Sequence, residues 1–267
     1  MGTKIICIAI RRLPERLESS EFPLAESGRI EYYPGDLALP RFGLTGAQQS
    51  DIFNQVDVVI HNGADTSHMK PYIALRDTNV ESTRCLIQLC VERHIPLHYI
   101  SSAGIAILSK LRPFPSVRVS GHIKDLSADG SMGYACSKWV CERMLEGTNT
   151  HYGLPIWIHR PSTIIRQGHD AETQRASFDW VNIFLEYSHK IQAVPQIVNN
   201  QGALDLVHVQ TCCNDIIAEV KSNKPRLASG MTYQNNVGDV VIPIGGLSEI
   251  ALEKGHLKPY QILPWEE

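Results

Sequence analysis

The stretch "VDVVIHNGADTS", residues 56–67, joins a short run of β-branched apolar residues to a loop of small and polar ones. Such a run predicts a strand that is buried on both faces, as the strands of parallel sheets are. In a doubly wound sheet, ligands bind in the crevice outside the carboxyl ends of the strands. The stretch therefore predicts a buried strand of a parallel sheet. With the alternation of strand and helix patterns along the chain, it predicts an α/β protein with a Rossmann-like doubly wound parallel sheet and the edge of the sheet at which a site lies.

Strand patterns and helix patterns alternate through the first 161 residues. It predicts further strands at 4–10, 29–33, 97–102 and 154–161, and helices at 45–55, 71–94 and 134–148, with Thr45 as an N-cap. After Pro161 the rhythm loosens into a helix at 178–189, a strand at 203–209, a helix at 211–220 and a β-type run at 231–246. We predict two domains, 1–161 and 162–267, of which the second is a smaller C-terminal α+β lobe, partly interleaved with the first.

The composition excludes several classes of protein. A net charge of -3 without any basic run argues against a nucleic-acid partner. No stretch approaches the roughly 18 apolar residues of a membrane span. The seven cysteines form no CxxC pair and the histidines show no ligand spacing, so we expect no metal. A cytoplasmic protein that binds neither nucleic acid nor membrane is the expectation.

Three residues form the candidate catalytic set. Ser102 ends the predicted strand at 97–102, and Tyr134 and Lys138 stand one helical turn apart at the start of the helix at 134–148. In a carbonyl-reducing site, the serine hydroxyl binds the substrate oxygen and the tyrosine delivers a proton to it. The lysine lowers the tyrosine's pKa through its charge and binds the cofactor's ribose. A Tyr-x-x-x-Lys spacing alone also fits an exposed lysine beside a half-buried tyrosine on an amphipathic helix.

Other candidate positions have two readings each. Asp36 is either a turn residue or an adenine contact, and His61 with Asn62 either caps a strand end or faces a cofactor. Arg11 and Arg12 are either solvated charges or readers of a 2′-phosphate in an NADP enzyme. Ser102 is not expected to be a hydrolase nucleophile, because no G-x-S-x-G motif surrounds it.

Several longer stretches occur in a familiar order. They are "GDLALPRFGL", "VDVVIHNGADTSHMKPYIALRDTNVEST", "PLHYISSAG", "YACSKWVCERML", "HRPSTI", "LDLVHV" and "VGDVVIP". Together they resemble an extended short-chain dehydrogenase/reductase of the thioester-reductase type. More narrowly, they resemble the terminal reductase domains of fungal polyketide synthase–nonribosomal peptide synthetase hybrids.

The resemblance implies roles for matching positions. It makes Ser102, Tyr134 and Lys138 the catalytic triad. Cofactor-facing positions would be Arg11, Asp36, Leu37, His61, Gly63, Ala64, Asn79, Tyr134 and Lys138, with Arg160, Pro161 and Ser162 on the segment that closes over nicotinamide. The first domain would then bind NADP(H), and the second would face the substrate and its carrier.

The resemblance also implies an activity and its partners. Such domains use NADPH to release an acyl or peptidyl chain, held as a thioester on a phosphopantetheinylated carrier protein of a polyketide or nonribosomal peptide synthase, as an aldehyde or alcohol. Some relatives instead catalyse a redox-independent Dieckmann condensation that gives tetramic acids, which is the second hypothesis.

The chain departs from the family pattern at its start. No G-x-x-G-x-x-G occurs, and residue 1 stands just before what resembles the family's second strand. We therefore expect the backbone amides that bind pyrophosphate to be lacking, and with them the sheet's central strand, leaving two unpaired strand edges. Ser82 and Gln210 also replace a usual glycine and a usual acidic residue. A truncated, inactive paralogue that acts as a binding module is the third hypothesis.

Overall fold

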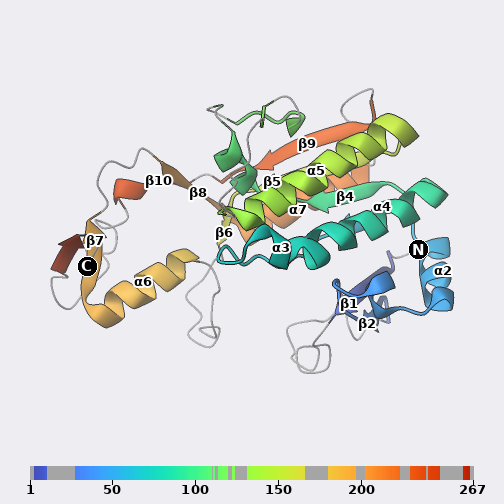
Figure 1. Ribbon diagram of the computed structural model, residues 1–267, viewed down its shortest axis with the longest axis horizontal. Coiled ribbons are helices and arrows are strands. Elements are labelled where there is room, and N and C mark those ends of the chain that lie inside the picture. Colours follow the sequence, from blue (N-terminus) through green and yellow to red (C-terminus); the bar gives the residue numbers. More distant parts are fainter. Residues whose placement is uncertain are drawn as a thin grey trace. The chain divides into compact units, whose positions relative to one another are not determined.

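The computed structural model describes eleven ranges of the chain and divides into two compact units (Figure 1). The described residues are 3–10, 28–109, 111, 114–119, 122–123, 131–165, 180–196, 202–222, 229–238 and 240–246, together with 261–264. One unit comprises Met1–Arg160 with Asn223–Gln234, and the other comprises Pro161–Ser222 with Asn235–Glu267.

The main sheet of the first unit has the strand order β3 (Val59–His61), β4 (Leu97–Ile100), β5 (Ile156–Pro161), β9 (Met231–Asn236). The first three are parallel, with Val59 opposite Leu97 and Leu97 opposite Ile156. Every residue of β4 and β5 is buried, as expected of parallel strands. The predicted Rossmann-like α/β class is confirmed.

Two long helices lie side by side along this sheet (Figure 1). α4 (Ser82–Arg93) follows α3 (Tyr72–Leu75) and the π-helical turn η2 (Arg76–Glu81), and α5 (Gly133–Tyr152) follows β4 and the short 3-10 helix η3 (Ala103–Leu108). Their apolar side chains join those of β4 and β5 in one cluster. The single helix predicted at 71–94 is thus interrupted by a π-helical turn, and Pro71 is the extended N-cap residue before it.

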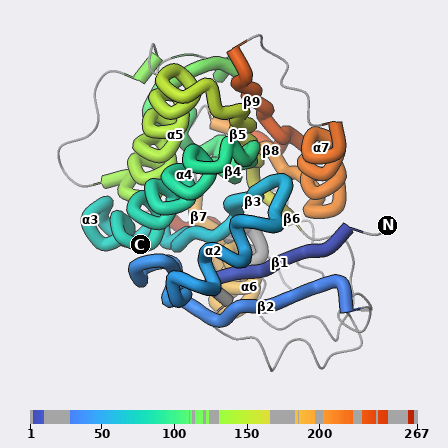
Figure 2. Tube along the Cα trace, turned by 90° about the vertical axis from the view of Figure 1, so that its right-hand side faces the viewer, coloured from blue at the N-terminus to red at the C-terminus, as the bar shows by residue number. Residues whose placement is uncertain are grey.

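The N-terminal part of the first unit is a parallel pair of strands with a helix beside it (Figure 2). β1 (Ile5–Ile10) pairs with β2 (Ile30–Pro34), which leads through the 3-10 helix η1 (Pro40–Gly43) to α2 (Gly46–Gln55). Thr45 caps α2 as predicted, because its Oγ1 accepts from the Gln48 backbone N–H at 3.2 Å while Gln48 Oε1 accepts from the Thr45 N–H at 2.9 Å.

Two strand edges are left without a partner in the part of the chain that the structure describes. β1 pairs only with β2, and β3 pairs only with β4. Ile5 of β1 is 44% exposed and Ile60 of β3 is 47% exposed, although strands of such sheets normally bury these side chains. The absence of a central strand stays an expectation.

The second unit is built from shorter pieces. β6 (Thr163–Ile165), β8 (Ala203–His208) and β10 (Val240–Pro243) form one sheet in the order β10-β8-β6, and β7 (Ala193–Gln196) pairs with β11 (Gln261–Pro264). The helices are α6 (Trp180–Ile191) and α7 (Val209–Ser222). The patterns did not predict β6, β7 or β11, since three or four residues carry too little periodicity. No helix within the described ranges of either unit has the length and apolarity needed to cross a membrane.

Candidate active site

The structure brings Ser102, Tyr134 and Lys138 together. Ser102 directly follows β4 and caps η3, with its Oγ accepting from the Gly104 N–H at 3.0 Å. Its hydroxyl is also hydrogen-bonded to the side chain of Tyr134, the second residue of α5. Lys138 lies one turn further along α5, with its Nζ 5.8 Å from the centroid of the Tyr134 ring. These are the contacts that the strand-end and i,i+4 positions predict.

Lys138 is held in the interior as a cation. Its side chain is only 3% exposed, its Nζ donates to the Ile100 carbonyl at 2.7 Å, and it lies 4.8 Å from the centroid of the Tyr99 ring. Burial lowers the pKa of Lys138 to about 8, while the nearby Cys141 and Glu142 act in the opposite direction. The ammonium is therefore the main form at neutral pH.

The net pKa of Tyr134 is set by its burial. Burial raises the pKa of Tyr134 to about 12, and the opposing effect comes from the hydrogen bond with Ser102. Tyr134 therefore keeps its proton at neutral pH, as a proton donor must. A lowering of the tyrosine's pKa by the charge of Lys138 stays a prediction, and burial outweighs any such effect.

Lys138→Met is expected to change how stability depends on pH. The pKa of Lys138 is about 8 in the folded chain, against an ordinary value of 10.5 for a lysine, so between these pH values the unfolded chain binds more protons. The free energy of unfolding therefore gains a contribution that rises with pH in this window, and the variant lacks it. Urea unfolding of both proteins from pH 7 to 11 measures the difference. Lys190→Met, at an exposed lysine, is the control; a wild-type-minus-variant difference that is flat with pH would contradict the assignment.

Asn79 anchors the loop that leaves β3. Its side chain pairs with the backbone of Asp65, accepting from the N–H at 2.7 Å and donating to the carbonyl at 3.0 Å. Its Nδ2 also donates to Ser137 Oγ at 3.0 Å, and Ser137 donates to the Tyr134 carbonyl at 2.8 Å. Asn79 thus fixes the loop against the first turn of α5. A contact between Asn79 and a cofactor stays a prediction.

His61 lies inside the fold as a neutral ring. Its Nε2 is 2.9 Å from Thr83 Oγ1, and since Thr83 donates its own proton to the Asn79 carbonyl, His61 Nε2 is the donor. Burial and the charge of Lys138 lower the pKa of His61 to about 3. Its side-chain contacts agree with the interpretation that His61 caps the strand end. Its role toward a cofactor stays a prediction.

Leu37 and Gly63 are in direct contact. A Cβ at Gly63 would lie 2.7 Å from Leu37 Cδ1, so the glycine allows this approach. Next to them, Asp36 Oδ1 accepts from the Ala38 N–H at 2.9 Å, which is the turn role that the sequence allowed. Ala64, the residue after Gly63, is half-buried. Cofactor contacts by these four residues stay predictions.

The remaining residues that were predicted to face the cofactor have other side-chain contacts or lie outside the described residues. Arg160 is 0% exposed and its guanidinium is bound to Glu142 and to two carbonyl groups, so only its backbone is left for a cofactor contact. Pro161 and Ser162 belong to the second unit, where Ser162 Oγ donates to Asp205 Oδ1 at 3.2 Å. Arg11 lies outside the described residues.

The residues at this edge fit the nicotinamide half of a dinucleotide. A serine hydroxyl, a protonated tyrosine and a buried ammonium converge at the carboxyl end of a parallel strand, where such sheets bind their ligands. Ser102 and Tyr134 would lie at the reacting carbonyl, and Lys138 at the nicotinamide ribose. A bound nicotinamide would supply the hydride.

Glu142 is linked to the end of β4 through Ser101, and sequence reasoning missed it. Ser101 donates to Glu142 Oε1 at 2.5 Å, and Glu142 is four residues after Lys138 on α5. The signal was present, because Tyr134, Lys138 and Glu142 follow one another at i,i+4 spacing on one helix face.

A family model and curated relatives match the chain. The NAD-binding family described as male sterility protein matches residues 8–216. The chain is 53% identical over 264 residues to the highly reducing polyketide synthase bet1 of Neocamarosporium betae, covering 99% of the chain and 9% of bet1. It is 37% identical over 261 residues to the PKS-NRPS hybrid synthetase psoA of Aspergillus fumigatus, covering 98% of the chain and 6% of psoA. The chain therefore spans less than a tenth of the curated relatives that it matches.

Solved structures show the same fold. The terminal R domain from the myxalamid PKS-NRPS biosynthetic pathway superposes with a TM-score of 0.69 at 25% identity, over 91% of this chain and 58% of that one. The reductase (R) domain of a nonribosomal peptide synthetase from Mycobacterium tuberculosis gives 0.68 at 20% identity, over 89% and 58%. The sequence-based resemblance to terminal reductase domains is thus confirmed.

Proposed function

Because this chain belongs to the NAD-binding family of male sterility proteins, we propose that it is an NADPH-dependent thioester reductase. The proposed substrate is an acyl or peptidyl chain held as a thioester on a carrier protein. Hydride addition to the carbonyl carbon gives a hemithioacetal, which expels the carrier's phosphopantetheine thiol to leave an aldehyde, and a second hydride from a second NADPH gives the alcohol. The observation that carries the proposal is the convergence of Ser102, Tyr134 and Lys138 at the end of β4. The similarity to polyketide synthases and hybrid synthetases supports a carrier-bound substrate of secondary metabolism.

The three side chains divide the work at the carbonyl oxygen. Ser102 donates a hydrogen bond to that oxygen, which draws charge toward it and holds it beside Tyr134. Tyr134 gives its proton to the oxygen as negative charge develops there, a favourable transfer because an alkoxide is a far stronger base than a phenolate. Lys138 stabilises the resulting tyrosinate through its positive charge, at the cost of being buried.

Arg11 and Arg12 are proposed to select NADPH over NADH. They follow β1, the position from which a 2′-phosphate is read in NADP enzymes. Replacing both by alanine is expected to raise the KM for NADPH about tenfold or more, and to leave the KM for NADH nearly unchanged, since charge-assisted bonds to the phosphate are lost. Steady-state kinetics with each cofactor measure this. Arg84→Ala, an exposed arginine of α4 paired with Glu81, is the control; equal effects on the two cofactors would rule the role out.

The proposal is tested with the purified chain, NADPH and an acyl thioester loaded on a phosphopantetheinylated carrier protein. The expected result is NADPH oxidation that depends on the thioester, with an aldehyde or alcohol as product. A tetramic acid formed from a β-ketoacyl aminoacyl thioester without NADPH would instead establish the Dieckmann-type cyclase. Binding of the carrier protein with no turnover of either kind would establish the inactive binding module.

A further inference from the structure

Helix α5 carries two buried carboxylates that the reaction does not use. At i,i+4 spacing, Tyr134, Lys138, Glu142 and Glu146 follow one another along the helix, and all four are buried. Tyr134 and Lys138 act at the carbonyl in the mechanism above. Glu142 is 0% exposed, and a carboxylate in that position is costly unless it is paired and fully hydrogen-bonded.

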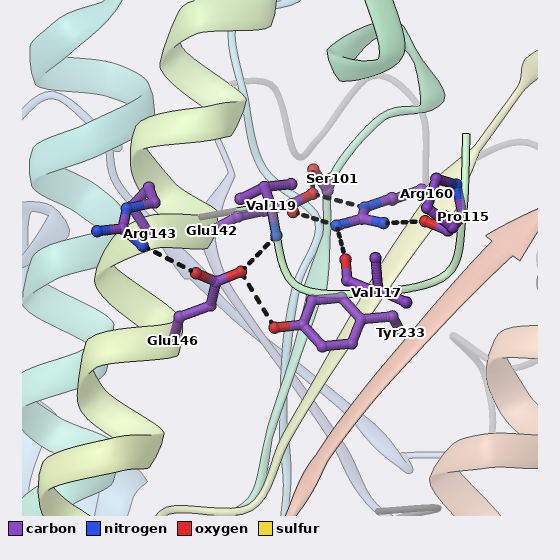
Figure 3. Close-up of polar contacts among 9 residues, drawn as sticks. All are labelled: Ser101, Pro115, Val117, Val119, Glu142, Arg143, Glu146, Arg160 and Tyr233. Atoms are coloured by element: carbon purple, nitrogen blue, oxygen red, sulfur yellow. Dashed lines mark hydrogen bonds and ion pairs between the residues drawn. The ribbon is translucent and has the colours of Figure 1, made fainter. Parts of the chain in front are cut away.

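Glu142 is paired with Arg160 at the end of β5 (Figure 3). Arg160 Nη2 donates to Glu142 Oε2 at 2.7 Å, and its Nε donates to Oε1 at 3.1 Å. The same Oε1 accepts from Ser101 Oγ at 2.5 Å. The remaining Arg160 donors reach the carbonyls of Pro115 at 3.2 Å and Val117 at 2.9 Å. The guanidinium thus joins α5 to β5 and to the segment after η3.

Glu146 secures the same segment one helical turn further on (Figure 3). Its Oε1 accepts from the Val119 N–H at 2.8 Å and from the Tyr233 hydroxyl at 3.1 Å, and its Oε2 is 3.3 Å from Arg143 Nη1. None of these bonds involves the strand end that carries Ser102. Glu142 and Glu146 therefore lie on the same helix face and are both buried, but only Glu142 contacts Ser101, the residue next to the catalytic serine.

The end of β4 is tied to α5 residue by residue. The Ile100 carbonyl accepts from Lys138, the Ser101 hydroxyl donates to Glu142, and the Ser102 side chain is bonded to Tyr134. Three consecutive strand-end residues thus meet three consecutive turns of one helix. The middle contact is the one that the ion pair with Arg160 holds in place.

We propose, resting on the function proposed above, that the buried Glu142–Arg160 pair positions the catalytic strand end. By fixing Ser101, the pair sets the distance of Ser102 from Tyr134. It also sets the position of the Ile100 carbonyl, to which Lys138 donates. Glu142 and Arg160 are positioning residues and touch no substrate. Stability alone is a weak explanation for their pairing, because well-packed apolar residues often replace a buried ion pair without loss of stability.

Glu142 also contributes its charge to the surroundings of Lys138. The groups that face this ammonium are Tyr134, Cys141 and Glu142 on α5, Tyr99 on β4 and His61 on β3. Among these, Cys141 and Glu142 raise the pKa of Lys138 against the effect of burial. Loss of the Glu142 charge is therefore expected to lower the pKa of Lys138 further below about 8.

Two variants test the proposal. Ser101→Ala removes the hydroxyl that links the strand end to Glu142 and leaves the ion pair intact. Glu142→Gln combined with Arg160→Met removes both charges at once, so that no lone charge stays buried. Glu146→Gln is the control, a buried glutamate of the same helix face without contact to the strand end.

Activity is the first measurement. Ser101→Ala and the double variant are each expected to lower kcat about tenfold or more with little change in KM, as misplaced catalytic groups do. When kcat is measured against pH, its fall on the alkaline side is expected to begin at lower pH in the double variant only. Glu146→Gln is expected to leave kcat and its fall on the alkaline side unchanged.

Stability is the second measurement, and it needs no activity. In the wild type, the contribution of Lys138 to the free energy of unfolding begins to rise near its folded pKa of about 8. In the double variant the rise is expected to begin at lower pH. If the wild-type chain proves inactive, the proposed function fails, and this profile still decides whether Glu142 acts on Lys138. Wild-type kcat in both variants, or an unmoved profile in the double variant, would overturn the proposal.

Discussion

Tyr134→Phe is expected to lower kcat for thioester reduction by at least about 100-fold, the size typical of a lost general acid. The variant keeps the ring, which packs edge-on against His68 with centroids 4.9 Å apart, and loses only the hydroxyl. That hydroxyl is bonded to Ser102, which also accepts from the Gly104 N–H and so keeps a partner. The thermal unfolding midpoint is therefore expected to stay close to that of the wild type, and stopped-assay product analysis measures kcat.

Tyr152→Phe is the matched control. Tyr152 ends the same helix but is 62% exposed, so removal of its hydroxyl is expected to change neither kcat nor stability. Retention of wild-type turnover in Tyr134→Phe would mean that another group supplies the proton.

Gly133→Ala is expected to damage both stability and turnover. A Cβ at Gly133 would lie 2.4 Å from the Lys70 carbonyl oxygen, 2.6 Å from the Tyr72 nitrogen and 2.7 Å from the Pro71 carbonyl carbon. All three are backbone atoms, so the start of α5 has to move. We expect a loss of about 1–3 kcal/mol in the free energy of unfolding, the range for overpacked sites. Because Tyr134 is the next residue, kcat is expected to fall about 100-fold, as for a displacement of roughly 1 Å.

Gly147→Ala in the same helix is the control for this substitution. Apart from its chain neighbours and the backbone of its own helix, no atom lies within 4 Å of a Cβ at Gly147, so the change adds only the helix preference of alanine. A gain of about 0.5–1 kcal/mol in the free energy of unfolding and unchanged kcat are expected. Chemical unfolding of the two variants side by side measures the contrast; equal stability of both would show that the backbone near Pro71 yields easily.

The elements that local sequence specifies could be predicted closely. The β-branched run before His61 gave β3, and Thr45 with Gln48 gave the start of α2, because the two side chains complete a capping box. Ser102 at the end of β4 and the i,i+4 pair Tyr134 and Lys138 on α5 could also be predicted to lie together, because strand ends and helical spacing have standard geometry. Each of these features depends on a few neighbouring residues and on standard geometry.

What depends on burial and distant partners could not be predicted. The pKa of Tyr134 is raised because α5 buries the hydroxyl, and no sequence pattern gives that depth. Arg160 lies near the end of an apolar strand and was predicted to face the cofactor, yet its guanidinium lies against Glu142, 18 residues earlier in the chain. The π-helical turn at Arg76–Glu81 was missed as well, since its residues fit an ordinary helix equally well.

The most direct test of a carbonyl-reducing site at Ser102, Tyr134 and Lys138 follows the hydride itself. NADPH that carries deuterium at the transferable position of the nicotinamide ring is incubated with the chain and a carrier-bound acyl thioester, and the released product is analysed by mass spectrometry. A reductase site predicts an aldehyde or alcohol with deuterium on the former thioester carbonyl carbon, and no label transfer with Tyr134→Phe. A released product without deuterium, formed equally well in the absence of NADPH, would contradict it.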